Sequence, residues 1–175
     1  AITINFPTPQ PKAKYAKKRL VHVDHLMLYR SLFAAGATVT LRTDSKPLRD
    51  YALGQFAAAG YDTLWVSDDV RRDHPEHPET EYECRTREMG AAVYGICATP
   101  GEKPTEEQLA AGRAQEQSLA CYLPDNLDEL TYVPLGMEEA VENFKNRARK
   151  GKKRLPQESQ GLLTVSYTHL RAHET

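Results

Sequence analysis

Short apolar segments that alternate with helical stretches constrain the fold of this chain most. Four segments have the β-branched or alternating pattern of strands: residues 2–6, 38–43, 61–70 and 91–98. Between the first three, residues 22–33 and 47–59 place apolar side chains at helical spacing, and Gly36 and Gly60 follow where these helices end. The order strand, helix, strand, helix, strand, strand predicts an α/β fold, in which half of a sheet finishes with an antiparallel strand pair.

Composition narrows the class of protein. With 40% hydrophobic and 27% charged residues, the 175-residue chain suits one domain with additional polar sequence. Its formal net charge is -1, so any affinity for nucleic acid must come from clustered basic residues. No stretch approaches the roughly 20 apolar residues that cross a bilayer, and the N-terminus lacks a secretory pattern. These features predict a soluble protein without a membrane segment.

The cysteines and histidines offer no metal site by their spacing. Cys84, Cys97 and Cys121 are odd in number, widely separated and free of CxxC pairs, which argues against a disulfide framework and against zinc. A reducing cytoplasm is the expected location. His169 and His173 have the i, i+4 spacing of helix-borne ligands, but the carboxylate of an HExxH pattern is missing. No metal is therefore assigned.

The chain divides by composition into three regions: residues 1–99, 100–154 and 155–175. The first holds the strands, and its opening strand at a non-methionine residue suggests a truncation point. The second is polar: residues 100–117 predict a linker or an appended helix, and residues 137–149 a further helix. Seven of the ten residues 145–154 are basic, which fits either a nucleic-acid contact or a solvated tail. The third region is expected to be disordered, and residues 164–175 resemble a translated sequencing adapter.

A proline-rich loop follows the first strand. Pro7, Pro9 and Pro11 exclude helix and central strand and set a rigid path. Ligands in open α/β sheets lie outside the carboxyl ends of strands, so this loop is placed to line a pocket. Five basic side chains among residues 12–19 could hold phosphates: Lys12, Lys14, Lys17, Lys18 and Arg19. The alternative is a solvated basic turn that enters a helix.

Two further sets of polar residues could contact a base. Asp44 follows the second strand, where its carboxylate could accept hydrogen bonds from amino and imino groups, or could instead cap the next helix. Residues 80–83 combine two carboxylates with an aromatic ring that can stack on a base: Thr80, Glu81, Tyr82 and Glu83. A hydrated acidic loop is the alternative interpretation of that segment.

The order and spacing of these three sets resemble the tRNA (guanine-N7)-methyltransferase family. In that family, a strand ends in Asn-Phe and an Asp-Pro-Trp-Pro-Lys-type motif with a basic run, followed by Thr-Asp and then Thr-x-Tyr/Phe-Glu. The matching residues are Asn5-Phe6, Pro9, Pro11-Lys12, Lys17 to Leu20, Thr43-Asp44 and Thr80 to Glu83. The resemblance covers about residues 1–99. It implies the C-terminal half of a Rossmann-like class I methyltransferase sheet.

The resemblance also implies an activity and a set of site residues. It implies transfer of a methyl group from S-adenosylmethionine to N7 of a guanine in tRNA, with no membrane partner and an oligomeric state left open. The glycine-rich donor loop of the family has no counterpart here, so the fragment alone is expected to be inactive. Family substrate contacts correspond to Lys12, Asp44 and residues 80–83. The catalytic and donor-binding aspartate corresponds to Thr8, and the tryptophan of the motif to Gln10.

The loss of that aspartate leaves two functional interpretations. Guanine N7 carries a free lone pair, so methyl transfer needs alignment and electrostatics rather than a base or a metal. A neutral threonine would slow the reaction by about one to two powers of ten, on the scale of one lost charge-assisted hydrogen bond. The chain is then a methyltransferase fragment. The alternative is a non-catalytic RNA-binding relative that has lost the aspartate. Independently of that loss, a third interpretation is an α/β fragment with a basic loop and no role in RNA binding.

Overall fold

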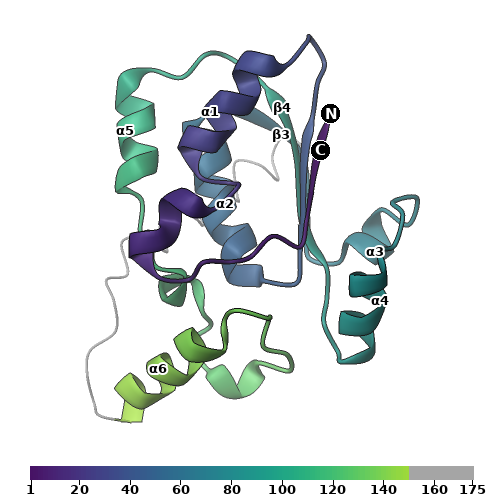
Figure 1. Cartoon of the computed structure of the whole chain (residues 1–175), viewed down its shortest axis with the longest axis vertical. Helices are drawn as coiled ribbons and strands as arrows, with labels where there is room; N and C mark the ends of the chain where they lie inside the picture. The colour runs from purple at the N-terminus through teal and green to yellow at the C-terminus, as the bar shows by residue number, and fades with distance from the viewer. Residues whose placement is uncertain (150–175) are drawn as a thin grey trace.

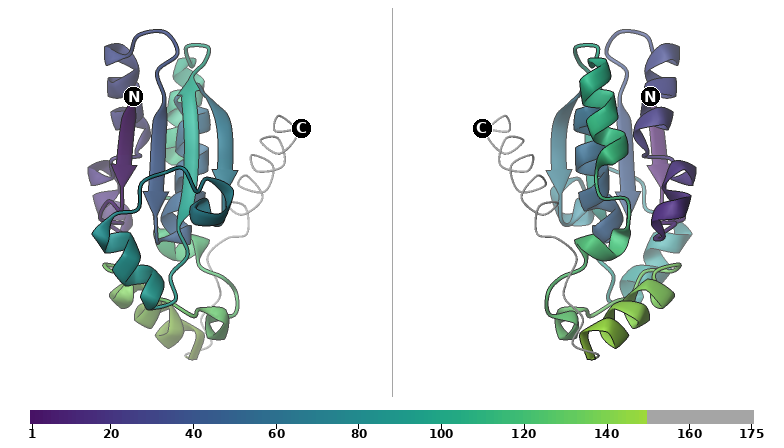
Figure 2. Two further views of the ribbon diagram at one scale, coloured as in Figure 1. Left: turned by 90° about the vertical axis from the view of Figure 1, so that its right-hand side faces the viewer. Right: turned by 90° about the vertical axis from the view of Figure 1, so that its left-hand side faces the viewer.

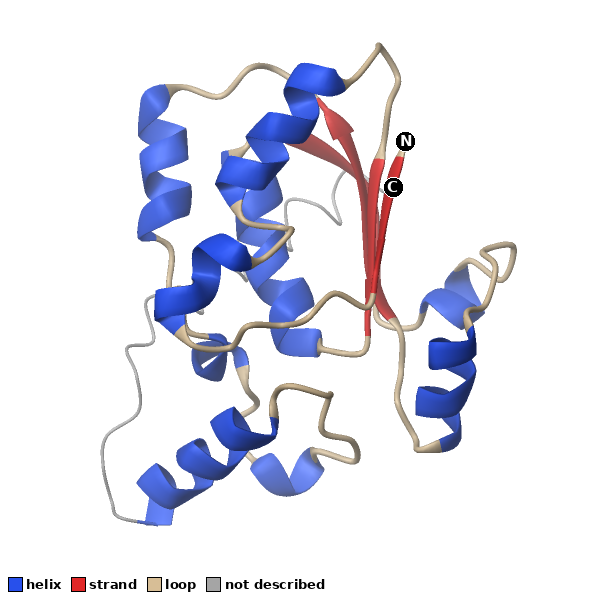
Figure 3. Ribbon diagram, viewed as in Figure 1, coloured by secondary structure: helices blue, strands red, loops and turns tan. Residues whose placement is uncertain are grey.

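The computed structural model describes residues 1–149, which form a four-stranded sheet with helices around it (Figures 1 and 3). The strands are β1 (Ile2–Asn5), β2 (Val39–Thr43), β3 (Tyr61–Ser67) and β4 (Tyr94–Pro100). The α-helices are α1 (Val23–Leu32), α2 (Lys46–Ala58), α3 (Val70–Asp73), α4 (Glu81–Glu88), α5 (Glu106–Ala114) and α6 (Glu138–Arg149). Three 3-10 helices complete the fold: η1 (Ala13–Lys18), η2 (Leu119–Tyr122) and η3 (Leu127–Glu129).

The sheet has the strand order β1-β2-β4-β3. β1 and β2 are parallel, with Ile2 opposite Val39, whereas β4 runs antiparallel to both β2 and β3. The predicted α/β fold with a terminal antiparallel arrangement is confirmed. Because β1 and β2 are parallel neighbours, their carboxyl ends meet at one edge of the sheet, and the residues that follow each strand come together there.

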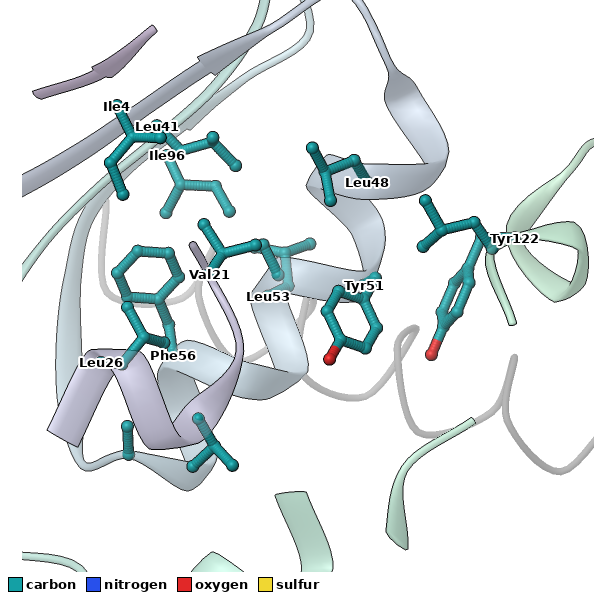
Figure 4. Close-up of a cluster of buried hydrophobic side chains, with 14 of the residues drawn as sticks. Ile4, Val21, Leu26, Leu41, Leu48, Tyr51, Leu53, Phe56, Ile96 and Tyr122 are labelled. Carbon is teal, nitrogen blue, oxygen red and sulfur yellow. The ribbon is translucent and has the colours of Figure 1, made fainter. Parts of the chain in front are cut away.

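Three of the α-helices cover one face of the sheet. Figures 1 and 2 show α1, α2 and α5 over this face, while α3 and α4 lie on the opposite side, with α4 near the carboxyl end of β1. The core lies between the sheet and α2, where Leu41 and Ile96 of the strands and Phe56 of α2 are buried (Figure 4). This single core holds α2 rigidly behind the edge where β2 ends.

The start of α2 settles the role of Asp44 in helix capping. Ser45, not Asp44, is the N-cap, and its hydroxyl accepts a hydrogen bond from the backbone N–H of Leu48 at 3.2 Å. Pro47 stands in the first turn, where its missing N–H costs nothing. The Asp44 carboxylate therefore does not cap α2, although the sequence alone left that role open.

Removal of the Ser45 hydroxyl tests this arrangement. Ser45→Ala should lower the free energy of unfolding by about 1 kcal/mol, because the amide at the start of α2 loses its acceptor. Urea denaturation followed by circular dichroism measures the change. Ser31→Ala on α1 is the control, since that exposed hydroxyl only bonds the Leu28 carbonyl of its own helix. Equal effects of the two substitutions would contradict the assignment of Ser45 as the cap.

Residues 71–90, between the third and fourth predicted strands, contain helices that the sequence did not predict. They contain most of α3 and all of α4, and Thr80 is the N-cap of α4, whose hydroxyl accepts from Glu83 N–H at 3.1 Å. The α4 sequence is highly charged and has no apolar stripe, so helical periodicity could not reveal it. The alternative interpretation of residues 80–83 as a hydrated acidic loop is wrong, because these residues form the cap and first turn of a helix.

The polar region beyond β4 packs onto the core. Residues 106–114 form α5, which is an appended helix rather than a linker: it packs on α2 at Gly112, where an added Cβ would approach Ala58 Cβ to 2.6 Å. Met137 and Val141, at the end of the region, are buried in the same hydrophobic cluster as the sheet. The predicted helix at 137–149 is α6.

Some sequence interpretations lie outside the described residues. They concern the tail 155–175, the histidines His169 and His173 within it, and the basic residues 150–154. Among residues 1–149, no helix is long and apolar enough to span a membrane.

Candidate nucleotide-binding site

The loop after β1 has an unusual backbone that a buried arginine stabilises. Phe6 and Gln10 adopt positive φ angles of 48° and 51°, which non-glycine residues rarely do. Arg19 donates from Nε to the Pro9 carbonyl at 3.1 Å and from Nη2 to the Gln10 carbonyl at 2.6 Å. Its guanidinium also lies 4.5 Å from the ring centre of Tyr51. Such strained residues concentrate at functional sites, which makes this loop a candidate.

The basic residues after the loop divide into two kinds. Arg19 is only 1% exposed, so its expected contact with a phosphate is corrected: it shapes the loop instead. Four lysines are exposed, and their contact with a phosphate stays a prediction: Lys12, Lys14, Lys17 and Lys18. The ammonium of Lys12 pairs with Oε1 of Glu139 on α6 at 3.1 Å. Thr8 is exposed in the same loop.

Asp44 is the centre of the site at the carboxyl end of β2. Its side chain is 7% exposed, and its Oδ2 accepts hydrogen bonds from the hydroxyls of Tyr82 at 3.0 Å and Tyr132 at 2.8 Å. The Tyr82 ring lies 4.9 Å from the ring of Phe6. The structure therefore brings together Phe6, Asp44 and Tyr82, which lie far apart in the sequence.

The two phenols beside Asp44 remain proton donors at neutral pH. Burial, followed by the Asp44 charge and its hydrogen bond, raises the pKa of Tyr82 to about 12. Burial also raises the pKa of Tyr132, with the Asp44 hydrogen bond as the next cause. Since both hydroxyls keep their protons, the Asp44 carboxylate is an acceptor surrounded by donors.

Glu83 is buried in an ion-pair network. Its side chain is 0% exposed; Oε2 pairs with Arg42 on β2, and Oε1 accepts from Arg71 at 2.9 Å. Arg42 is itself 1% exposed and also donates to the Pro78 carbonyl at 2.8 Å. The expectation that Glu83 contacts substrate directly is corrected, because both of its oxygens are occupied. The network instead joins α4 to β2 and thereby positions Tyr82.

The other residues of the 80–83 motif take separate roles. Thr80 caps α4, and Glu81 is a largely exposed surface residue 3.7 Å from Arg85. Tyr82 is the member of this motif whose side chain touches Asp44. The sequence placed four residues in one site, and the structure assigns them to a cap, a solvent-exposed side chain, a site contact and a buried support.

A cavity of about 350 Å³ opens beside Asp44. One side comes from the sheet end and α2, including Asp44, Lys46 and Tyr94. The other side comes from the C-terminal region, including Tyr132 and Met137. A cavity of this volume is within the range of small-molecule sites. Sequence reasoning missed Tyr132, since no motif marks a residue that lies 88 positions from its hydrogen-bond partner.

A second polar cluster lies away from Asp44. Atoms of His74, Glu76 and His77 that could ligate a metal lie within 4.8 Å of one another. The His74 ring, however, stacks on Trp65 at 3.9 Å between centroids, and its Nδ1 lies 3.4 Å from Glu76. Packing accounts for this cluster, and the expected absence of a metal stays a prediction.

Comparison with known proteins shows which family this chain matches. Residues 1–96 match the model of a family described as "Putative methyltransferase". The chain belongs to this family. The resemblance proposed from the sequence and the Rossmann-like fold class are confirmed, and the matched methyltransferase segment contains Thr8, Lys12, Asp44 and Tyr82.

Curated relatives carry a more specific name. Three proteins called tRNA (guanine-N(7)-)-methyltransferase align over about half of the chain. The relative from Streptococcus equi subsp. zooepidemicus is 31% identical over 97 residues, that from Exiguobacterium sibiricum 32% over 99, and that from Alkaliphilus oremlandii 34% over 98. These alignments cover 55%, 56% and 55% of this chain and 46% of each relative. The chain thus spans a little under half the length of the methyltransferases it matches.

The comparison also separates the two sides of the cavity. Asp44, Lys46 and Tyr94 belong to the matched methyltransferase segment, whereas Tyr132 and Met137 lie beyond its end at residue 96. The site at the end of β2 is therefore built from family residues that contact a C-terminal region outside the family match.

Proposed function

We propose that the protein to which this sequence belongs transfers a methyl group from S-adenosylmethionine to N7 of a guanine in tRNA, in the cytoplasm. One observation carries the proposal: Asp44 and Tyr82 of two separate family motifs meet at the carboxyl end of β2, beside the loop with Thr8 and Lys12. The names of the aligned relatives support the choice of reaction and substrate.

The substrate side of the reaction follows from these residues. A guanine presents N1–H and N2–H donors, and a buried carboxylate such as Asp44 can accept both. Tyr82 and the Arg42–Glu83 pair behind it hold that carboxylate in place. Exposed Lys12, with the lysines of η1, can neutralise the phosphates that flank the base. With the base fixed in this way, its N7 lone pair can attack without a general base.

The donor side is represented in this sequence by Thr8. S-adenosylmethionine supplies a methyl group bound to a positively charged sulfur. The Thr8 hydroxyl is exposed beyond the end of β1 and fits a hydrogen bond to the donor, but it lacks the countercharge that an aspartate would offer. We propose that the other donor contacts come from residues that are not part of this sequence, next to the free edge of β1.

The proposal is tested with the full-length protein. Purified protein is incubated with tRNA and labelled S-adenosylmethionine, and nucleosides are scored for N7-methylguanosine. Label in N7-methylguanosine supports the proposal. The second function, a non-catalytic RNA-binding relative, is favoured by Thr8 at the aspartate position, and it predicts salt-dependent tRNA binding without label.

Restoring the aspartate should accelerate the enzyme. Thr8→Asp is expected to raise turnover by about tenfold, because a carboxylate stabilises the positive charge that moves from sulfur toward the purine. Single-turnover kinetics with saturating tRNA measure the step. Thr8→Asn, similar in size but uncharged, is the control and should stay near the original rate. Equal rates for the original protein and both variants would show that Thr8 takes no part in the methyl transfer.

A further inference from the structure

The C-terminal region contacts both groups that the proposed substrate would bind, Asp44 and Lys12. Tyr132 donates its hydroxyl proton to Oδ2 of Asp44 at 2.8 Å, and Glu139 places a carboxylate 3.1 Å from the Lys12 ammonium. A guanine would offer the same kind of donor to Asp44, and a phosphate the same kind of anion to Lys12. Residues 131–139 thus reproduce the two polar features of a guanine nucleotide.

The packing of residues 131–139 brings them to the site from one side. Gly136 has a φ angle of 87° and lies so near the loop that an added Cβ would come within 3.4 Å of Pro9 Cδ. Met137 is fully buried and ties the segment to the core. In Figures 1 and 2, α6 lies beyond the carboxyl ends of β1 and β2. The segment therefore covers the site and is anchored to the core by the buried side chain of Met137.

The hydrogen bonds at Asp44 leave no room on Oδ2 for both phenols and a base. A carboxylate oxygen accepts about two hydrogen bonds, and Oδ2 already accepts from Tyr82 and Tyr132. A guanine that uses both carboxylate oxygens must displace one hydroxyl. Tyr82 is fixed through α4 and the buried Glu83 network, whereas Tyr132 stands in the irregular stretch between η3 and α6. Tyr132 is the group that leaves.

We propose that the cavity beside Asp44 takes the base of a guanine nucleotide, and that residues 131–139 occupy the nucleotide's contacts until it binds. This inference rests on the proposed function for the identity of the base. The segment acts as an intramolecular competitor: Tyr132 holds Asp44, Glu139 holds Lys12, and both contacts are exchanged for those of the ligand. Tyr94 and Met137 line the cavity that the base enters.

Nucleotide binding to the 175-residue chain tests the two contacts separately. Guanosine and guanosine 5'-monophosphate are titrated by NMR against the original chain and variants. Tyr132→Phe keeps the ring but removes the donor, and should tighten binding of both ligands by about three- to tenfold. Glu139→Gln should tighten only the monophosphate, by about two- to threefold, because the exposed ion pair with Lys12 is weak. Adenosine should gain nothing from Tyr132→Phe.

Matched controls come from the same chain. Glu142→Gln removes a charge from an exposed site on α6, and Tyr29→Phe removes a hydroxyl that bonds the carbonyl of Leu20, and neither Tyr29 nor Leu20 lines the cavity. Both should leave the affinities unchanged. Hydrogen exchange gives an independent measurement: guanosine should speed exchange in residues 131–139, because they leave their partners.

The outcomes distinguish this inference from the proposed function. Unchanged or weaker guanosine binding by Tyr132→Phe, slower exchange in residues 131–139 on binding, or no guanosine binding by any variant overturns the inference. If the full-length protein makes N7-methylguanosine while one of these results holds, the inference alone fails. If Tyr132→Phe binds guanosine more tightly but the full-length protein transfers no methyl group to tRNA, the proposed function alone fails.

Discussion

Glu83→Ala should lower the free energy of unfolding by about 3–5 kcal/mol, the range for a buried ion pair that loses one partner. Both oxygens of Glu83 are engaged by arginines, and Arg42 is 1% exposed, so the substitution leaves a cation inside the protein without its countercharge. Urea denaturation of the whole chain, followed by circular dichroism, measures the loss.

The control for Glu83 lies two residues away. Glu81→Ala, on the same turn of α4, removes a carboxylate whose side chain is 87% exposed, and should change stability by less than about 0.5 kcal/mol. A double variant, Arg42→Met with Glu83→Leu, removes both charges and should regain much of the loss. Similar effects of Glu81→Ala and Glu83→Ala would show that the buried network does not exist.

Asp44→Asn in the full-length protein should reduce kcat/KM for tRNA methylation by about 10- to 100-fold. Asparagine keeps the size of the side chain and one acceptor oxygen, which can still bind the Tyr82 hydroxyl. It loses the charge that strengthens hydrogen bonds from guanine, worth about 1–3 kcal/mol. Initial rates at varied tRNA concentration separate an effect on binding from an effect on turnover.

Asp62→Asn is the matched control for Asp44. Asp62 is an exposed carboxylate on β3, so its neutralisation changes the net charge equally without touching the site. Its kcat/KM should stay within about twofold of the original value. A comparable loss in both variants would mean that general electrostatic attraction, rather than a contact with guanine, makes Asp44 important.

Much of the fold could be predicted because its signals are local. β-branched segments, helical spacing and glycines near helix ends identified the four strands and two of the helices over the sheet. Helix α4 was missed, because five of its eight residues are charged and the helix has no apolar stripe, and because its position depends on the buried Glu83 pair. Helix α5 could be anticipated, but its packing depends on a close approach at Gly112 that no pattern reveals.

The site shows the same division at the level of single residues. Lys18 and Arg19 are neighbours of like charge, yet one faces solvent and the other supports the loop from inside. Glu81 and Glu83 are equally acidic in the sequence, but one is exposed and the other is fully buried. Residue type predicts which chemistry is available. Burial, which depends on the packing of distant elements, decides whether a ligand can reach it.

By its sequence alone, the chain already specified an α/β sheet, a rigid proline-rich loop after its first strand, and an acid after its second, since spacing and backbone preferences are local properties. Only the tertiary structure decided that Asp44 meets Tyr82 rather than capping α2, that Arg19 and Glu83 are supports, and that Tyr132 reaches the site from 88 residues away. These contacts arise because the parallel order of β1 and β2 and one shared core gather remote segments at a single edge of the sheet.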